Sequence, residues 1–464
     1  MPNSAVPAVL DHIDATLDAA RERLFALLRI PGVSAQPNHD ADCAASAMWL
    51  SNELEAIGFA VDVLPTAGHP VLLARMAGPA GAPHLLYYGH YDVQPAEPLE
   101  LWTHPPFDPQ LVDGPRGKRI VARGAVDDKG QAMMIVAALR AWREAHGSIP
   151  VGCTVLIEGE EEIGSLNLEP FLETYKDRLG ADVAVISDTT MWDIDTPALT
   201  TRLRGLTFLE VTLRGPSRDL HSGMYGGSAL NPLNALARIL GELHDDQGRI
   251  RLPGFYDGVR EISPAQAAQW EGLRFDEGAY LHAIGLAAPA GEADRPALQR
   301  LWSRPTADIN GLWGGYTGVG AKTVIASEAS AKISFRLVPD QDPQEVAQQF
   351  RRFVTERLPK GASAAFQILA AGPGIAINEE SVFMRAAAAV LEEEFSRAPV
   401  MMGCGGSIPV VESLRRILGI DSVLMGFGLD DDQPHSPNEK FELRCFHRGI
   451  RSHARLIGRL AGLG

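Results

Sequence analysis

Three short apolar runs in this chain each end in histidine or acidic residues, and this recurring arrangement constrains the fold more than any other feature. The runs and their endings are Leu85–Tyr88 before Gly89-His90-Tyr91-Asp92, Val151–Ile157 before Glu158-Gly159-Glu160-Glu161-Glu162, and Val183–Ser187 before Asp188. The runs have the length of strands, and patterns typical of amphipathic helices, such as Gly130–Glu144, alternate with them. Strands that alternate with helices predict an α/β domain with a mixed, mostly parallel sheet sandwiched by helices.

The pattern changes near Arg204, where a second kind of domain is predicted. Two strand–helix pairs follow, and they are Gly205–Leu213 with Ala229–His244 and Ala331–Val338 with Asp342–Arg357. Helical patterns then return, the last of them over Lys440–Leu463. We therefore predict a discontinuous α/β domain over residues 1–203 and 371–464, interrupted by an α+β domain over residues 204–370.

The charge balance narrows the classes of partner. Lys and Arg total 42 against 58 Asp and Glu, so the formal net charge is −16, which disfavours nucleic acid and anionic membrane surfaces. No apolar run approaches the ~18 residues of a membrane helix, and the N-terminus lacks the basic and apolar parts of a signal peptide. The four cysteines are scattered without a CxxC pair, which is typical of reduced thiols. We expect a cytoplasmic protein that binds neither nucleic acid nor membrane.

The acidic endings of the strands indicate a cation site. Ligands of open α/β sheets bind at the carboxyl ends of strands, where these endings would meet. Two further acidic elements are Asp127-Asp128, directly before the Gly130 helix, and the stretch from Asp430 to His435. Carboxylates gathered in this way repel one another, and cations relieve that repulsion. Imidazole together with carboxylate suits Zn²⁺, Co²⁺ or Mn²⁺.

Each of these elements also has an ordinary structural interpretation. His90 alone is more often a satisfied polar core residue than a ligand, and Asp127-Asp128 could simply cap the following helix. The run Glu160–Glu162 could be a solvated turn, and His435 an ordinary loop residue. Their joint occurrence at strand ends is much harder to obtain by accident, and it favours the metal site.

These residues belong to motifs that resemble the M20 family of metallopeptidases, close to its cytosolic dipeptidase and carnosinase-like branch. The matching segments span nearly the whole chain in order, and they are Gly89–Pro95, Arg123–Gly130, Glu158–Ser165, Ser187-Asp188, Arg218–Gly223, Lys322–Ile325, Arg336–Pro339, Gly405–Pro409 and His435–Glu439. The resemblance implies a fold of the di-zinc exopeptidase type, in which the inserted domain over 204–370 is a lid that also forms a homodimer.

The resemblance also implies a ligand set for two divalent metal ions per subunit, zinc in the first place, with manganese or cobalt as alternatives. Asp127 would bridge the two ions. One ion would add His90 and Asp188, and the other would add Glu162 and His435. Such a pair of ions would share a hydroxide that attacks the peptide carbonyl.

Further roles follow from the same resemblance. Glu161 would be the general base, although spacing alone cannot choose among the three consecutive glutamates, and Asp92 would orient the imidazole of His90. His221 would reach the active site of the partner subunit and stabilise the oxyanion. Arg336 would hold the terminal carboxylate of the substrate. Two more residues match substrate-contacting positions, and they are Thr323 and Ser407.

The sequence thus predicts a di-metal dipeptidase that acts on dipeptides or short peptides with a free C-terminal carboxylate. One alternative is another enzyme of the same family, either an N-acyl or N-succinyl amino acid amidohydrolase or a carboxypeptidase. Arg336 does not discriminate between them, because all these substrates carry a carboxylate. An alternative of another class is an inactive binding protein on a peptidase fold, which the presence of all five proposed ligands and the base disfavours.

Overall fold

The computed structural model describes residues 5–406 and 408–463, and the chain divides into two compact units. Unit 1 comprises Met1–Thr201, Ile377–Met402 and Pro409–Gly464, and unit 2 comprises Arg202–Ala376 and Gly403–Ile408. The loop Gly403–Ile408 therefore groups with unit 2, whereas the sequence-based boundaries place it in the α/β domain.

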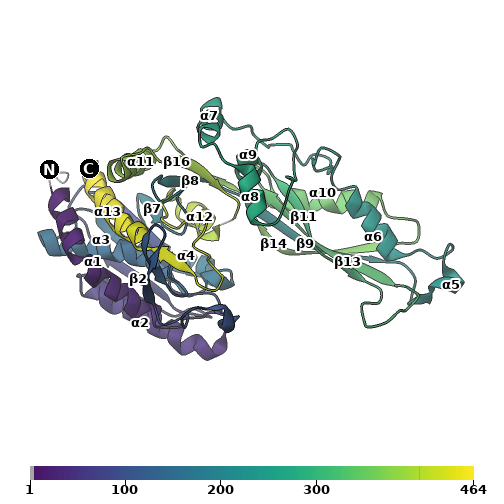
Figure 1. Cartoon of the computed structure of the whole chain (residues 1–464), viewed down its shortest axis with the longest axis horizontal. Coiled ribbons are helices and arrows are strands. Elements are labelled where there is room, and N and C mark those ends of the chain that lie inside the picture. Colours follow the sequence, from purple (N-terminus) through teal and green to yellow (C-terminus); the bar gives the residue numbers. More distant parts are fainter. Residues whose placement is uncertain (1–4, 407, 464) are drawn as a thin grey trace. The chain divides into compact units, whose positions relative to one another are not determined.

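A mixed sheet of nine strands forms the centre of unit 1 in the described part of the chain (Figure 1). In sheet order its strands are β1 (Ala60–Leu64), β2 (Val71–Met76), β6 (Gly152–Glu158), β3 (His84–His90), β7 (Val183–Ile186), β17 (Ser422–Leu424), β8 (Ala198–Leu203) and β15 (Ile375–Ala376), and β16 (Val400–Cys404) pairs with β8. The central strands β6, β3, β7 and β17 are parallel. Every residue of β6 and β7 is buried, as expected for parallel strands that are covered on both faces.

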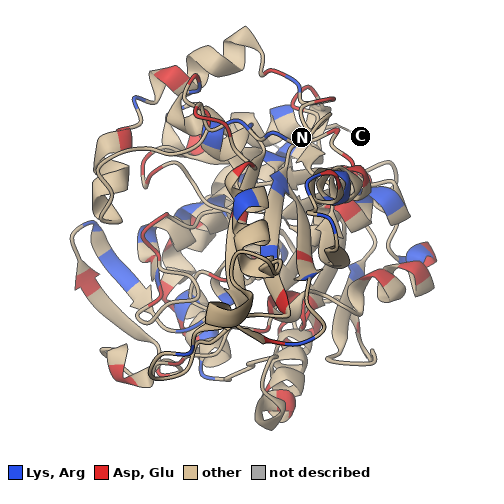
Figure 2. Ribbon diagram, turned by 90° about the vertical axis from the view of Figure 1, so that its right-hand side faces the viewer, with Lys and Arg blue, Asp and Glu red and all other residues tan. Residues whose placement is uncertain are grey.

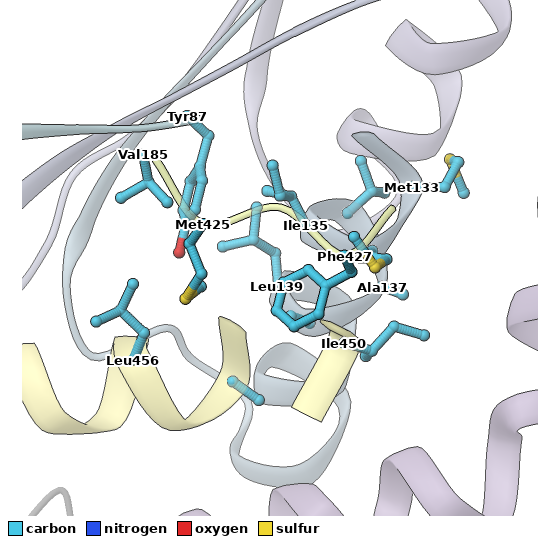
Figure 3. Packing of buried hydrophobic residues seen from close by; sticks show 14 of the residues in the cluster. Tyr87, Met133, Ile135, Ala137, Leu139, Val185, Met425, Phe427, Ile450 and Leu456 are labelled. Carbon is cyan, nitrogen blue, oxygen red and sulfur yellow. The ribbon is translucent and has the colours of Figure 1, made fainter. Parts of the chain in front are cut away.

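Helices pack around this sheet and bury its apolar residues. They are α1 (Val6–Leu28), α2 (Asp40–Glu55), α3 (Lys129–His146), α4 (Leu168–Thr174), α11 (Val382–Phe395), α12 (Pro409–Ser413), which continues into a π-helical turn (Leu414–Leu418), and α13 (Leu443–Leu460). Figure 3 shows Tyr87 of β3 and Val185 of β7 among Ile135 and Leu139 of α3 and Leu456 of α13. This core fixes α3 against the sheet, with its first residue directly after Asp128.

One predicted helix begins later than the sequence indicates. Residues Lys440–Glu442 form a strand, β18, and the helix α13 starts only at Leu443. The strand pairs with β5 (Gly117–Val121), which in turn pairs with β4 (Gln110–Gly114). Phe441 is fully buried in this small sheet, and its burial together with the ladder hydrogen bonds overrides the helical pattern.

Unit 2 is built on a separate antiparallel sheet. Its strands, in sheet order, are β11 (Thr306–Gly314), β13 (Glu328–Leu337), β9 (Gly205–Arg214) and β14 (Ser363–Gly372). Its helices are α5 (Ser222–Tyr225), α6 (Pro232–Gly241), α7 (Pro264–Gly272), α8 (Glu277–Ala283), α9 (Ala297–Trp302) and α10 (Pro343–Glu356), and a short ribbon joins β10 (Leu220–His221) to β12 (Val324–Ile325). Helices α6 and α10 contact the sheet and share its apolar core, which alternates along β9 as Leu209, Val211 and Leu213.

Charged residues are distributed along both units. Figure 2 shows Lys and Arg interspersed with Asp and Glu along the ribbon, in keeping with a sequence that has no block of one charge. Among the residues that the structure describes, no helix is both long enough and apolar enough to span a membrane.

We expect the Leu456→Ala variant to be less stable than the wild type. Leu456 is fully buried beneath the sheet, and deleting a buried leucine side chain typically lowers the free energy of unfolding by about 2–5 kcal/mol. Urea denaturation followed by circular dichroism measures this change. The matched control is Met48→Ala on α2, where half of the side chain is exposed, so its stability should stay close to that of the wild type.

Candidate metal centre

The parallel strands β6, β3 and β7 are neighbours, and their carboxyl ends lie at the same edge of the sheet. His90, the last residue of β3, is directly opposite Glu158, the last residue of β6. Tyr88 on β3 is opposite Ile186, which precedes Asp188 by two residues. The predicted meeting of these strand ends is therefore present, and the next strand along the sheet, β17, leads into the segment that contains His435.

Histidine and acidic side chains from five segments form two groups that share one residue. His90, Asp127 and Asp188 offer ligand atoms that all lie within 4.8 Å of one another, and so do Asp127, Glu162 and His435. Asp127 belongs to both groups because it stands just before α3, between the two histidines. Its Oδ1 is 3.2 Å from Nε2 of His90, and its Oδ2 is 2.9 Å from Nε2 of His435.

The buried His90 is held from behind by Asp92. Its Nδ1 lies 3.1 Å from the backbone oxygen of Asp92 and 3.4 Å from the Asp92 carboxylate. The same carboxylate accepts hydrogen bonds from the Ser34 hydroxyl and from the backbone N–H groups of Glu161 and Glu162. Asp92 thus fixes the imidazole and also fixes the turn that carries the two glutamates.

His435 contacts Glu162. Nε2 of His435 is 3.2 Å from Oε2 of Glu162, and the side chain of His435 is half exposed. Gln94, which follows the His90 segment, donates from Nε2 to Oε2 of Glu162 at 2.9 Å. Gln94 therefore orients Glu162, a role that the sequence motif does not reveal.

Comparisons with known proteins agree with the candidate metal site described above. The model of peptidase family M20/M25/M40 matches residues 86–459. The Cys-Gly metallodipeptidase dug1 of Schizosaccharomyces pombe is 30% identical over 97% of this chain and 97% of its own length, and the beta-Ala-His dipeptidase of Homo sapiens is 31% identical over 85% of this chain and 78% of its own. The chain belongs to peptidase family M20/M25/M40.

Solved structures of M20 enzymes share the fold. The structure of the dipeptidase Dug1p from Saccharomyces cerevisiae matches with a TM-score of 0.82 and 27% identity, covering 100% of this chain and 99% of that chain. The structure of human carnosine dipeptidase 1 matches with a TM-score of 0.81 and 28% identity, covering 98% and 99%. The mixed central sheet with helices and the separate antiparallel sheet of unit 2 are thus the M20 architecture.

The electrostatics of the two groups suit divalent cations. Burial raises the pKa of Glu161 to about 8, and the charges of Asp188 and Glu162 add to this effect. Burial and the charge of Asp127 raise the pKa of Asp188 to about 6. Bound cations would stabilise the charged carboxylates against both burial and mutual repulsion.

Neighbouring carboxylates also raise the pKa values of the two histidines, because they favour the charged imidazolium form. Hydrogen bonds to Asp127 and Glu162 raise the pKa of His435 to about 10. Burial opposes a charged imidazole at His90, but Asp127 and Asp92 nevertheless raise its pKa well above the ordinary value. Nε2 of His90 is buried and makes no hydrogen bond, so it is an orphaned ligand atom aimed at Asp127. The donor set of imidazoles and carboxylates therefore fits metal ions such as zinc.

A buried ion pair joins the segments that carry these candidate ligands. Glu439 accepts hydrogen bonds at Oε1 from the backbone N–H groups of Val126 and Asp127, and at Oε2 from that of Gly124 and from Nη1 of Arg123. The guanidinium of Arg123 also donates to the backbone oxygen of Pro95. The Arg123–Glu439 ion pair, called the clamp below, therefore connects the segments that carry His90, Asp127 and His435. Both clamp residues stand within the sequence motifs, but only the fold assigns them this role.

The segment that carries His435 has an unusual backbone. Gln433, His435 and Asn438 have φ values of 58°, 59° and 62°, in the left-handed region that non-glycine residues seldom adopt. Asn438 accepts a hydrogen bond from the backbone N–H of Thr103 and donates one to the backbone oxygen of Leu101. These bonds and the clamp offset the cost of that conformation, which aims the imidazole at Asp127.

The remaining predicted site residues lie in unit 2 or outside the described residues. His221 ends the short strand β10, is exposed, and accepts a hydrogen bond at Nδ1 from the backbone N–H of Gly223. Thr323 accepts a hydrogen bond at its backbone oxygen from Ser222, next to His221. Arg336 is half-buried on β13, and Ser407 lies outside the described residues.

We expect Glu439→Ala to destabilise the protein and weaken metal binding. The change leaves the buried charge of Arg123 unpaired and frees three backbone N–H groups, so the free energy of unfolding should fall by about 3–5 kcal/mol. Loss of outer support for ligands typically costs about 10- to 100-fold in metal affinity. Chemical denaturation and competition with a chromophoric chelator measure the two effects.

A surface ion pair provides the control for this experiment. The Asp113 side chain is almost fully exposed beside Lys118, and such pairs contribute about 0–1 kcal/mol, so Asp113→Ala should change neither quantity appreciably. If the Glu439→Ala protein were as stable as this control, the Arg123–Glu439 pair would not stabilise the fold as described here.

Proposed function

We propose that this protein is a metallodipeptidase that hydrolyses dipeptides or short peptides with a free C-terminal carboxylate, using two divalent cations, zinc in the first place. The observation that carries this proposal is the pair of ligand groups that share Asp127. The names of its relatives, Cys-Gly metallodipeptidase and beta-Ala-His dipeptidase, support the substrate class.

The proposed ligands divide as the geometry suggests. Asp127 would contact both cations, His90 and Asp188 would hold one, and Glu162 and His435 would hold the other. When bound, such cations supply Lewis acidity, which makes water an effective nucleophile near pH 7.

The protein's own residues would then transfer the proton and position the substrate. The backbone N–H of Glu161 donates a hydrogen bond to Asp92, which positions Glu161, so its carboxylate would take a proton from water and pass it to the leaving amine. His221 would donate to the oxyanion of the tetrahedral intermediate, and Arg336 would hold the terminal carboxylate with its fork of donors. Thr323 and Ser407 remain proposed substrate contacts.

We expect Glu161→Gln to abolish most turnover while metal content stays unchanged. General acid–base catalysis typically contributes about 10²- to 10⁴-fold, so kcat should fall by this amount. Dipeptide hydrolysis and elemental analysis measure the two quantities, and a chelator should abolish wild-type activity reversibly. Glu173→Gln on the exposed side of α4 is the control. A panel of dipeptides, tripeptides and N-acyl amino acids tests the substrate class, and full activity in Glu161→Gln would refute the mechanism.

We further propose that unit 2 is a lid that also forms a homodimer, with His221 serving the partner subunit. The edge strand β11 exposes Ile309, Leu312 and Trp313, an apolar surface of the kind that associates. The chain has free cysteines, of which Cys43, Cys153 and Cys445 are buried, and this is compatible with a cytoplasmic location.

Mixing two inactive variants tests the shared site. Homodimers of Glu161→Gln and of His221→Ala should each be inactive, and exchange of subunits should restore part of the wild-type activity, because one site in the hybrid then has both intact residues. Activity after mixing and the mass in solution by light scattering are the measurements. No recovery in demonstrably mixed dimers would place His221 in its own subunit's site or outside catalysis.

A further inference from the structure

Two arginines of unit 2 lie near each other at one end of its sheet. Arg336 on β13 is directly opposite Leu206 on β9 and Thr306 on β11, so these three side chains share one face. Arg204 lies between β8 and β9, directly before Gly205, which is opposite Leu337 on β13. Its charge acts on that of Arg336, and Asp308 of β11 also lies close enough to act on Arg204.

Neither guanidinium has an acidic partner within ion-pairing distance among the residues that the structure describes. Both side chains are half-buried. Burial and the neighbouring charge of Arg336 lower the pKa of Arg204, and Asp308 only partly offsets this. The two most buried arginines elsewhere, Arg123 and Arg304, are by contrast each bonded to a buried glutamate. Arg204 and Arg336 thus form a positive site that a bound anion would stabilise.

The position of the Arg204 guanidinium is fixed by a glycine loop of the same unit. Its Nε donates to the backbone oxygen of Gly405 at 3.1 Å, and its backbone N–H donates to that of Cys404. A Cβ at Gly405 would lie only 2.7 Å from Nη2 of Arg204. The guanidinium therefore packs directly on the loop backbone, where a larger residue would displace it.

Arg204 borders a cavity. Arg204, Thr306 and Asp308 line a cavity of about 490 Å³, which is within the usual range for small-molecule sites, although Arg336 is not among the residues that line it. Arg204, Arg336 and Asp308, whose charges act on one another, together carry one net positive charge. That charge matches a single carboxylate better than a dianionic group.

We infer that Arg204 is a second substrate-binding cation, which holds the C-terminal carboxylate of the peptide together with Arg336. The inference rests on the proposed function, because Arg336 is taken there as a carboxylate ligand. It adds to Arg336 a second residue that selects the free C-terminal carboxylate of the proposed function, so C-terminal amides should be poor substrates because they lack the charge.

The test compares L-alanyl-L-phenylalanine with its C-terminal amide in the metal-loaded full-length protein. Hydrogen bonds to charged groups support a change of about 10- to 100-fold, so Arg204→Gln should raise KM for the free acid by this factor. Its kcat should change much less, and kinetics with the amide should stay close to those of the wild type. Arg204→Lys should recover part of the loss. The control Arg214→Gln, on the exposed end of β9, should behave as the wild type.

The outcomes separate this inference from the proposed function. Equal losses for acid and amide in Arg204→Gln would mean that Arg204 only supports the loop, and the inference would be wrong. If wild-type protein hydrolyses neither compound, the proposed function fails for this class. Calorimetric binding of N-acetyl-L-phenylalanine and its amide to chelator-treated protein then decides the inference without turnover. A preference for the acid that disappears in Arg204→Gln and persists in Arg204→Lys supports it, and no preference overturns it.

Discussion

Repulsion among carboxylates at one end of a sheet is the constraint on which this structure depends. Asp127, Glu161, Glu162 and Asp188 converge where burial leaves little water to screen them. His90 and His435 each lie next to one carboxylate oxygen of Asp127, and their imidazoles compensate part of the negative charge. The sheet supplies this arrangement because parallel strands deliver their ends to one edge, and the large apolar core beneath them supplies the stability that such a cluster lacks.

Rigid support around the cluster comes from residues that do not belong to it. Asp92 receives hydrogen bonds from the glutamate turn, and Glu439 receives them from the loop that carries Asp127. Each acceptor thereby fixes backbone N–H groups that would otherwise be free to reorient. The consequence is a site whose geometry is set before any ligand arrives, and such preorganisation reduces the cost of binding.

Much of this neighbourhood could be predicted from the sequence, and the reasons are physical. The strands that end at His90, Glu158 and Ile186 are short, apolar and separated by helices, so their common edge follows from local patterns alone. The place of Asp127 follows from the helix that begins after it. The roles of Gln94 and Glu439 could not be derived in this way, because each depends on a segment distant in the chain. The strand at Lys440–Glu442 was hidden by a helical pattern that continues through it, since only pairing with β5 decides between the two.

The loop Gly403–Ile408 has a consequence for the connectivity of the molecule. It groups with unit 2, although the first three residues of β16 before it and the whole of α12 after it lie in unit 1. The backbone therefore crosses between the units four times rather than twice. A deletion of residues 202–376 would not remove the whole of unit 2. It would leave residues 403–408 behind and remove Arg204, which contacts them. Each unit is built from separate segments of the chain, so neither can be transferred to another protein as one continuous segment.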